Sequence, residues 1–225
     1  MIRYHRDLIQ GSDEWLAARC GLLTASEMKM ILTPTLKMAQ NEKSRAHLWE
    51  LLAQRISGYV EPSFVSDDML RGYADEIEAR NLYAEKVAPV EEVGFITNDR
   101  WGFTLGYSPD ALVGDDGLIE VKSRRQKFQV ETIISGAVPL EYALQLQTAL
   151  LVSEREWVDF ISYSGGLPMI VLRVWPDDVT RAAILRAAEA FEADIAKHLE
   201  AWRDTLAAGG RLFPTERKIH QEIML

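Results

Sequence analysis

Cysteine, long apolar runs and excess positive charge are what this sequence has least of. Cys20 is the only cysteine among 225 residues, which excludes an intrachain disulfide and a zinc or iron–sulfur site built on several cysteines. No apolar run approaches the roughly 20 residues that a transmembrane helix needs. Residues 1–7 are polar and lack the apolar core of a secretory signal. We therefore expect a cytoplasmic protein that does not enter a membrane.

The charge balance is acidic, with 34 Asp and Glu against 25 Lys and Arg and a net charge of −9. Proteins that bind nucleic acid over much of their surface are usually basic, so the charge argues against a general nucleic-acid binder. A metal-dependent nuclease, in contrast, needs clustered carboxylates and can confine its phosphate contacts to one groove. The charge leaves that class of enzyme open.

The chain has the length and the 48% hydrophobic content of one well-packed domain. It contains no repeat, low-complexity tract or obvious linker. We expect a single domain over residues 1–225. It would consist of N-terminal helices at 12–88, a core at about 90–175, and a C-terminal helix and tail at 177–225.

Hydrophobic periodicity and end signals predict helices and strands along the whole chain. Ser12 or Asp13 can cap a first helix, Thr24 and Glu27 have capping-box spacing, and Gly72 is expected to break the first turn of a later helix. The predicted helices are 15–19, 24 to just before Pro34, 42–56, 67–87, 128–134, 140–152 and 177–208. The predicted strands are 90–97, 102–105, 107–113, 118–122, 157–163 and 169–174, the last two forming a hairpin. This order predicts an α/β fold with a central mixed β-sheet flanked by helices.

Two acidic residues and a lysine lie around a predicted hairpin in the middle of the chain. Asp110 follows Ser108 and Pro109, a Gly-Asp-Asp-Gly turn occupies 114–117, and Glu120 and Lys122 lie on the returning strand. Because strand side chains alternate, Glu120 and Lys122 share one face of that strand. Two carboxylates with a neighbouring ammonium suit metal-assisted hydrolysis of a phosphodiester. The spacing D-x(9)-E-x-K matches the PD-(D/E)XK signature of restriction-endonuclease-like nucleases, although so short an acidic pattern also arises from surface charges around a hairpin.

Further motifs, in the same order along the chain, resemble the lambda exonuclease family of phage recombination nucleases, also called YqaJ-like. These are a W-x(3)-R-x-G segment leading into Thr-Ala-Ser at 15–26, a G-x(3)-E helix at 72–76, the Ser108-Pro109-Asp110 and Glu120-Val121-Lys122 core, and a Y-x(2)-Q-x-Q helix at 142–147. Together they span about residues 10 to 165.

The resemblance implies a restriction-endonuclease-like core and assigns roles to individual residues. Asp110, Glu120, Lys122, Glu76 and Gln145 would be catalytic, and Asp110, Glu120, the Val121 carbonyl and Glu76 would hold Mg²⁺, or Mn²⁺ in its place, with two ions per site. Binding of a 5′-phosphate or of DNA would fall to Arg19, Ser26, Ser108, Thr24, Tyr142, Gln147, Arg124 and Arg125. Without the resemblance, Glu76 and Arg19 would be ordinary surface charges, Ser26 a helix cap and Tyr142 a core residue. Leu36 and Met38 are further candidates for an arch that parts the strands.

The resemblance implies an exodeoxyribonuclease that degrades one strand of linear duplex DNA in the 5′→3′ direction and leaves a 3′ overhang for phage-type annealing. It also implies a 5′-phosphorylated end as substrate, a homotrimeric ring, a single-strand annealing protein as partner, and a phage or prophage origin in a bacterial cytoplasm. Two alternatives stay open. One is a nuclease of the same fold with another polarity or endonuclease action, and the other is a non-catalytic module that binds DNA ends or protein.

Overall fold

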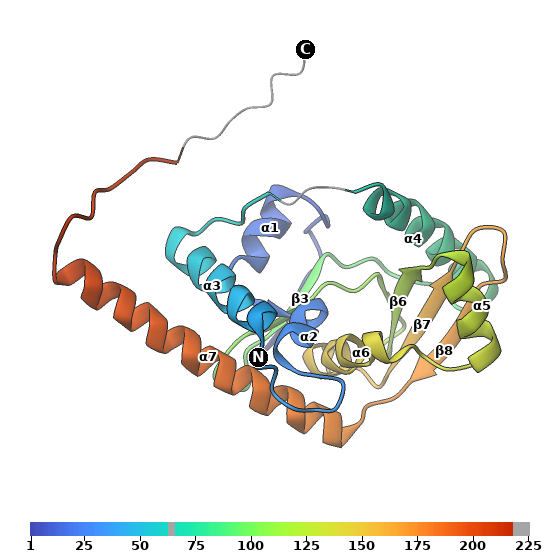
Figure 1. Cartoon of the computed structure of the whole chain (residues 1–225). Coiled ribbons are helices and arrows are strands. Elements are labelled where there is room, and N and C mark those ends of the chain that lie inside the picture. The colour runs from blue at the N-terminus through green and yellow to red at the C-terminus, as the bar shows by residue number, and fades with distance from the viewer. Residues whose placement is uncertain (63–65, 218–225) are drawn as a thin grey trace, which may run out of the picture.

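Two four-stranded mixed sheets form the centre of the computed structural model, which describes residues 1–62 and 66–217 (Figure 1). The first sheet has the order β1-β3-β4-β2, and the second has the order β5-β6-β7-β8. Their strands are β1 Ile2–His5, β2 Leu23–Thr24, β3 Phe95–Asn98, β4 Leu105–Tyr107, β5 Ala111–Val113, β6 Gly117–Ser123, β7 Trp157–Tyr163 and β8 Ile170–Val174. The chain passes from one sheet to the other through residues 108–110, so Asp110 lies at their junction.

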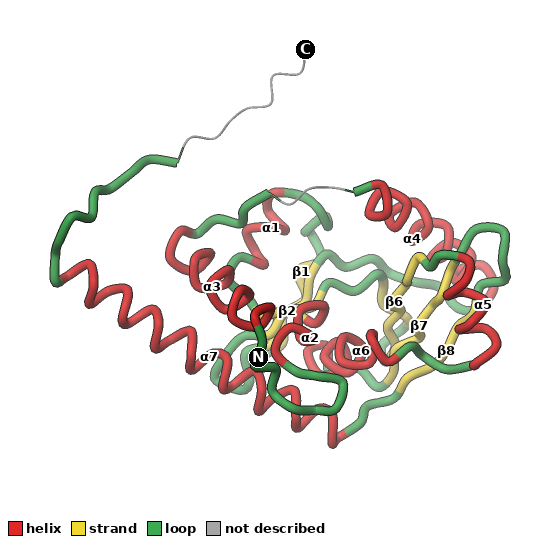
Figure 2. The backbone as a smooth tube through the Cα atoms, in the orientation of Figure 1, coloured by secondary structure: helices red, strands yellow, loops and turns green. Residues whose placement is uncertain are grey.

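Helices surround the strands, as Figure 2 shows. They are α1 Asp13–Arg19, the 3-10 helix η1 Ala25–Glu27, α2 Met28–Ile31, α3 Glu42–Ser57, α4 Asp67–Lys86, α5 Gln126–Ser135, α6 Leu140–Ser153 and α7 Asp178–Ala207. Several end where their sequence signals place them. Ser12 caps α1 by accepting the Trp15 N–H, Thr24 and Glu27 form a capping box, and Gly58 closes α3 in the left-handed conformation.

The two faces of the second sheet pack against different helices because side chains alternate along β6. Ile119 and Val121 pack with Ala79 and Tyr83 of α4 in one apolar cluster. Leu118 belongs to the other cluster, which contains most of the buried side chains of α6. The alternation predicted for 118–122 is therefore confirmed, and it puts Glu120 and Lys122 on the side of the sheet that α6 covers.

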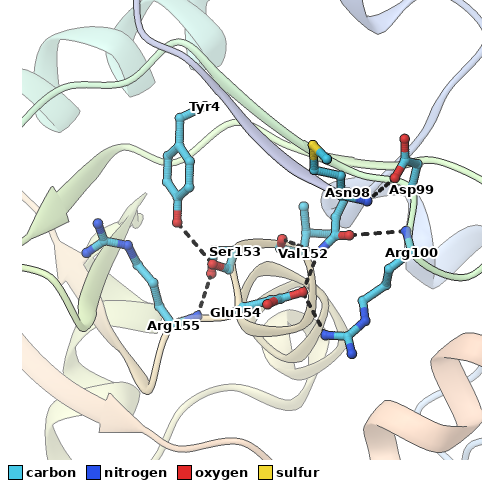
Figure 3. Close-up of polar contacts among 9 residues, drawn as sticks. Tyr4, Asn98, Asp99, Arg100, Val152, Ser153, Glu154 and Arg155 are labelled. Atoms are coloured by element: carbon cyan, nitrogen blue, oxygen red, sulfur yellow. Dashed lines mark hydrogen bonds and ion pairs between the residues drawn. The ribbon is translucent and has the colours of Figure 1, made fainter.

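Side chains from the first sheet and its loop hold the C-terminal end of α6 (Figure 3). The buried Asn98 amide donates to the Val152 carbonyl at 3.1 Å and to Glu154 at 2.9 Å, and Arg100 also contacts Glu154 at 2.8 Å. The Tyr4 hydroxyl donates to the Ser153 carbonyl at 3.0 Å. Carbonyls in the last turn of a helix lack partners within the helix, so these contacts both satisfy them and fix the position of α6.

Several predicted boundaries are corrected by the structure. Gly72 lies inside α4, which runs without a break from Asp67 to Lys86. The predicted strand 107–113 is two strands in different sheets, separated by residues 108–110, and the strand predicted at 102–105 lies instead at Leu105–Tyr107. The β-strands form two sheets rather than one, and β1 and β2 were not predicted. The α/β class with mixed sheets and flanking helices is confirmed.

The long helix α7 extends beyond the rest of the molecule at its C-terminal end (Figure 1). Residues 178–195 of α7 pack on the core through side chains such as Ile184, Phe191 and Ile195, whereas every residue from 201 to 217 is exposed. Trp202, Leu206 and Phe213 are large apolar residues in that exposed stretch. None of the helices in the described part of the chain is long and apolar enough to cross a membrane.

Candidate active site

Three carboxylates from different elements converge at the junction of the two sheets. Asp110 comes from the connection between β4 and β5, Glu120 from β6 and Glu76 from α4. One oxygen of Asp110 accepts the Val121 N–H at 2.5 Å. Burial, together with the neighbouring Glu120 and Glu76 carboxylates, holds the pKa of Asp110 well above its usual range. Burial also raises the pKa of Glu76, against the opposing effect of Arg80.

Glu120 is 2% exposed and accepts hydrogen bonds from three donors. The Tyr107 hydroxyl donates to one oxygen at 2.8 Å. Lys122 Nζ and Gln145 Nε2 donate to the other at 2.7 and 2.5 Å. Burial lowers the pKa of Lys122, but Glu120 and Asp110 outweigh that effect and raise it, so this lysine is protonated beside the carboxylates. The structure thus brings together all five residues that the sequence analysis assigned to catalysis.

The donor set fits a hard divalent cation. Two carboxylates and a main-chain carbonyl, from Asp110, Glu120 and Val121, are oxygen ligands of the kind that Mg²⁺ prefers. A cation would also relieve the repulsion that raises the pKa of Asp110 and Glu76. Within residues 1–62 and 66–217, no group of three or more His, Cys, Asp or Glu side chains is arranged to hold a metal ion. Glu76 instead contacts Arg80 at 3.2 Å, so its role as a ligand stays a prediction.

A second site lies on the other side of Pro109. Arg19 donates to the Ser108 hydroxyl at 3.1 Å and to the Thr24 hydroxyl at 3.4 Å, and its guanidinium lies 4.4 Å from the centre of the Trp15 ring. The exposed Ser26 hydroxyl is 3.4 Å from that of Thr24. Burial lowers the pKa of Arg19, and Glu27 opposes the shift. A largely enclosed guanidinium whose hydrogen bonds go to neutral hydroxyls is well suited to bind an anion.

Arg124, Tyr142 and Arg125 were also predicted to bind DNA, and the structure places them in different surroundings. Arg124 is buried and donates to Glu141 at 2.6 Å and to the Tyr142 hydroxyl at 2.7 Å, so it ties α6 to the end of β6. The Tyr142 ring lies 5.5 Å from Lys122 Nζ, at the edge of the acidic site. Arg125 is exposed at the start of α5.

Gln147 is placed elsewhere by the structure. Its amide donates to the Trp175 carbonyl at 2.9 Å and accepts the Asp177 N–H at 2.8 Å, which anchors the start of α7. Gln145 and Gln147 are two residues apart in a helix, so their side chains point about 200° apart. Only Gln145 faces Glu120, and the assignment of Gln147 to DNA binding is not supported by its position.

Three residues of the site were missed by the sequence analysis. Tyr107 donates to Glu120, Trp15 Nε1 donates to Ser108 at 3.0 Å, and Arg80 contacts Glu76 and the Asp110 carbonyl, each at 3.2 Å. Helical spacing could have indicated two of them, because Arg80 is four residues after Glu76 and Trp15 is four before Arg19. Tyr107 offers no comparable local signal.

Comparison with known proteins places the chain in a family. The family model described as the YqaJ-like viral recombinase domain matches residues 14–156, which include both sites. The chain belongs to the YqaJ-like viral recombinase family. It is 34% identical to an alkaline exonuclease from Laribacter hongkongensis, with a TM-score of 0.78 and coverage of 88% of this chain and 99% of that chain. A structure of the Laribacter exonuclease in complex with dAMP matches at 35% identity and a TM-score of 0.79, with the same coverage.

A phage-related exonuclease from Haemophilus somnus 129PT has the same fold as the present chain. The two are 11% identical, with a TM-score of 0.53 over 79% of this chain and 96% of that chain. No curated protein sequence matches the chain. The predicted family is confirmed by these matches, and they support the prediction of an exodeoxyribonuclease.

Proposed function

We propose that the protein is a Mg²⁺-dependent exonuclease that degrades one strand of linear duplex DNA from a phosphorylated 5′ end. It releases mononucleotides and leaves a 3′ single-stranded overhang for phage-type annealing in a bacterial cytoplasm. The observation that carries this proposal is the spacing of the two sites. Ser108 belongs to the Arg19 site and Asp110 to the acidic site, and only Pro109 separates them. A terminal 5′-phosphate bound at Arg19 therefore lies close to the carboxylates, which favours cleavage of the first phosphodiester bond.

The side chains divide the work at the acidic site. Asp110, Glu120 and the Val121 carbonyl would hold Mg²⁺, with Glu76 serving a second ion. Bound Mg²⁺ supplies a positive charge that polarises the phosphate and activates a water molecule. Protonated Lys122 can orient that water and offset negative charge that develops on the phosphate. Tyr107 and Gln145 fix the orientation of Glu120, and Arg80 does the same for Glu76.

The Laribacter relative supports the release of mononucleotides. It is called an alkaline exonuclease and has been solved with dAMP, a deoxynucleoside 5′-monophosphate. Cleavage at the first bond from a 5′ end releases a molecule of this kind. The proposed 5′→3′ polarity rests on the Arg19 site. This site can bind a terminal phosphate, and in the proposed substrate the terminal phosphate is at the 5′ end.

A homotrimeric ring would explain how an acidic chain stays on DNA. With a net charge of −9, the protein cannot rely on general attraction to phosphates, whereas a closed ring retains its substrate by topology. The exposed apolar side chains of Trp202 and Leu206 at the end of α7, and of Phe213 beyond it, support an interface with a second copy. The resulting 3′ overhang is the substrate of a single-strand annealing protein, which we include as a partner in the proposal.

Digestion of linear duplex DNA labelled at one end tests the proposal. With Mg²⁺, the wild-type protein should release labelled mononucleotide from a 5′-labelled strand before any 3′ label is lost. Lys122→Ala and Glu120→Gln should reduce the rate by at least about a hundredfold. Lys197→Ala, a change of an exposed lysine on α7, should leave it unchanged.

End preference has its own test. The wild-type protein should prefer a 5′-phosphate to a 5′-hydroxyl, and Arg19→Ala should remove that preference. Loss of 3′ label first would refute the polarity. Equal rates of the wild-type protein on 5′-phosphate and 5′-hydroxyl substrates would refute the role of Arg19.

A further inference from the structure

A cavity of about 350 Å³ opens beside the acidic site, within the range of sizes that small-molecule sites have. Its charged lining residues are Asp110, Glu76, Arg80, Arg6 and Glu92. Residues 8–10 and 93–94 form one wall, and the opposite wall is α4. Glu120, Lys122 and Gln145 do not line the cavity, and its lining residues other than Asp110, Glu76 and Arg80 have no role in the proposed function so far.

The cavity adjoins both sites that bind phosphate in the proposed function. Asp110 lines it directly. Gly94 also lines it, and the Gly94 carbonyl accepts the Trp15 indole N–H at 3.1 Å. The same indole N–H donates to Ser108, the partner of Arg19. A nucleotide with its 5′-phosphate at Arg19 and its 3′-phosphate at the carboxylates has its sugar and base beside this cavity.

The wall formed by α4 combines charge with apolar surface. Tyr73, Glu76, Ile77 and Arg80 follow one another at helical spacing and share one face of the helix. Tyr73 is 55% exposed and Ile77 is 50% exposed, whereas the side chains of Arg80 and Glu76 beside them are only 14% and 27% exposed. Ile9 lines the cavity from the other wall and is 76% exposed. An exposed aromatic ring beside a phosphate-binding site is a common platform for a nucleobase.

The polar side chains around the cavity already have partners. Gln10 donates to the Pro109 carbonyl at 2.8 Å, and Arg6 is paired with Glu91. Arg80 contacts Glu76, Glu92 and the Asp110 carbonyl. Base-specific reading needs donors and acceptors that can turn to the base edge. The cavity therefore offers stacking and apolar contact, which every base accepts.

We propose that this cavity holds the sugar and base of the 5′-terminal nucleotide, with Tyr73 stacked on the base and Ile77 and Ile9 in contact with it. The proposal rests on the proposed function, because that function defines the strand end. Tyr73 is then a positioning residue that holds the terminal nucleotide in place for cleavage without selecting its base.

The first test measures binding without cleavage. The probe is the 5′-monophosphate of 2-aminopurine deoxyriboside, whose fluorescence falls when the base stacks. The full-length protein in EDTA should quench this fluorescence, and Tyr73→Phe should keep the quenching. Tyr73→Ala should weaken binding about tenfold. Trp175→Ala is the matched control, since Trp175 is 57% exposed and lies outside the cavity. Equal binding by Tyr73→Ala and the wild-type protein would overturn the proposal.

The second test measures cleavage of duplexes that carry a normal or an abasic nucleotide at the 5′ end. The wild-type protein and Trp175→Ala should show a KM about tenfold higher for the abasic end, and Tyr73→Ala should treat both ends alike. An active wild-type enzyme that does not distinguish the two ends would overturn the nucleoside site and leave the exonuclease function intact. A protein that binds the probe through Tyr73 but releases no nucleotide would refute the exonuclease function and leave the site intact.

Discussion

Replacing Asp110 with Asn should stabilise the metal-free protein while it abolishes nuclease activity. Asp110 is held among Glu120 and Glu76, and its raised pKa means that ionisation of this carboxyl opposes folding. Each unit by which the folded-state pKa exceeds the unfolded value costs about 1.4 kcal/mol once the group is ionised in both states. Asn removes this cost, keeps the shape of the side chain and can still accept the Val121 N–H.

The stability difference between the Asp110→Asn variant and the wild-type protein should depend on pH. Below the unfolded pKa of about 3.9, Asp110 is protonated in both states, so the two proteins should differ little in stability. As the pH rises through the folded-state pKa, the wild-type protein loses stability that the variant keeps. The difference in free energy of unfolding should therefore grow as the pH rises above about 4.

Urea unfolding in EDTA at about pH 4 and about pH 8 measures the effect. Added Mg²⁺ supplies the control, because a metal at 100 times its dissociation constant stabilises the wild-type protein by about 2.7 kcal/mol and should stabilise the variant far less. A variant that is less stable than the wild-type protein in EDTA at pH 8 would refute the idea that these carboxylates repel one another until a cation binds.

Three further predictions concern residues that hold the site in place. Tyr107→Phe removes the hydroxyl that donates to Glu120 and should reduce metal affinity or activity about tenfold. Titration of the cleavage rate with Mg²⁺ measures this effect, and an unchanged rate at every Mg²⁺ concentration would contradict the prediction. Gly94→Ala places a methyl group 2.0 Å from the Leu8 carbonyl oxygen, so the melting temperature should fall clearly, whereas Gly72→Ala meets no atom within 4 Å and serves as the control. Asn98→Ala removes a buried donor to the end of α6 and should cost about 1–3 kcal/mol in urea unfolding; a loss below about 0.5 kcal/mol would mean that α6 does not depend on this contact.

Features that depend on a few neighbouring residues were predictable. The cap at Ser12, the capping box of Thr24 and Glu27, and the end of α3 at Gly58 are set by local backbone chemistry, and each lies where the sequence indicates. The side chains of β6 alternate as predicted because a strand repeats every two residues. The prediction failed at Gly72, because the unbroken helix α4 tolerates the higher helical cost of one glycine.

Features that depend on distant pairing were not predictable from local pattern. β2 has only two residues, Leu23 and Thr24, and exists because it pairs with β4 some 80 positions later. The connection at residues 108–110 divides what looks like one strand into members of two sheets. Tyr107 gives no sign in the sequence that its hydroxyl reaches Glu120, since that contact depends on the way the two sheets meet.

The sequence by itself determined the chemistry of this protein. Asp110, Glu120 and Lys122, together with the family motifs around them, indicated a metal-dependent nuclease, because residue types and strand periodicity are local properties. Only the tertiary structure decided how these groups act together. It separated Gln145 from Gln147, enclosed Arg19 among hydroxyls, and formed a cavity lined by both Tyr73 and Asp110. These arrangements depend on packing between elements far apart in the chain, and no short stretch of sequence encodes them.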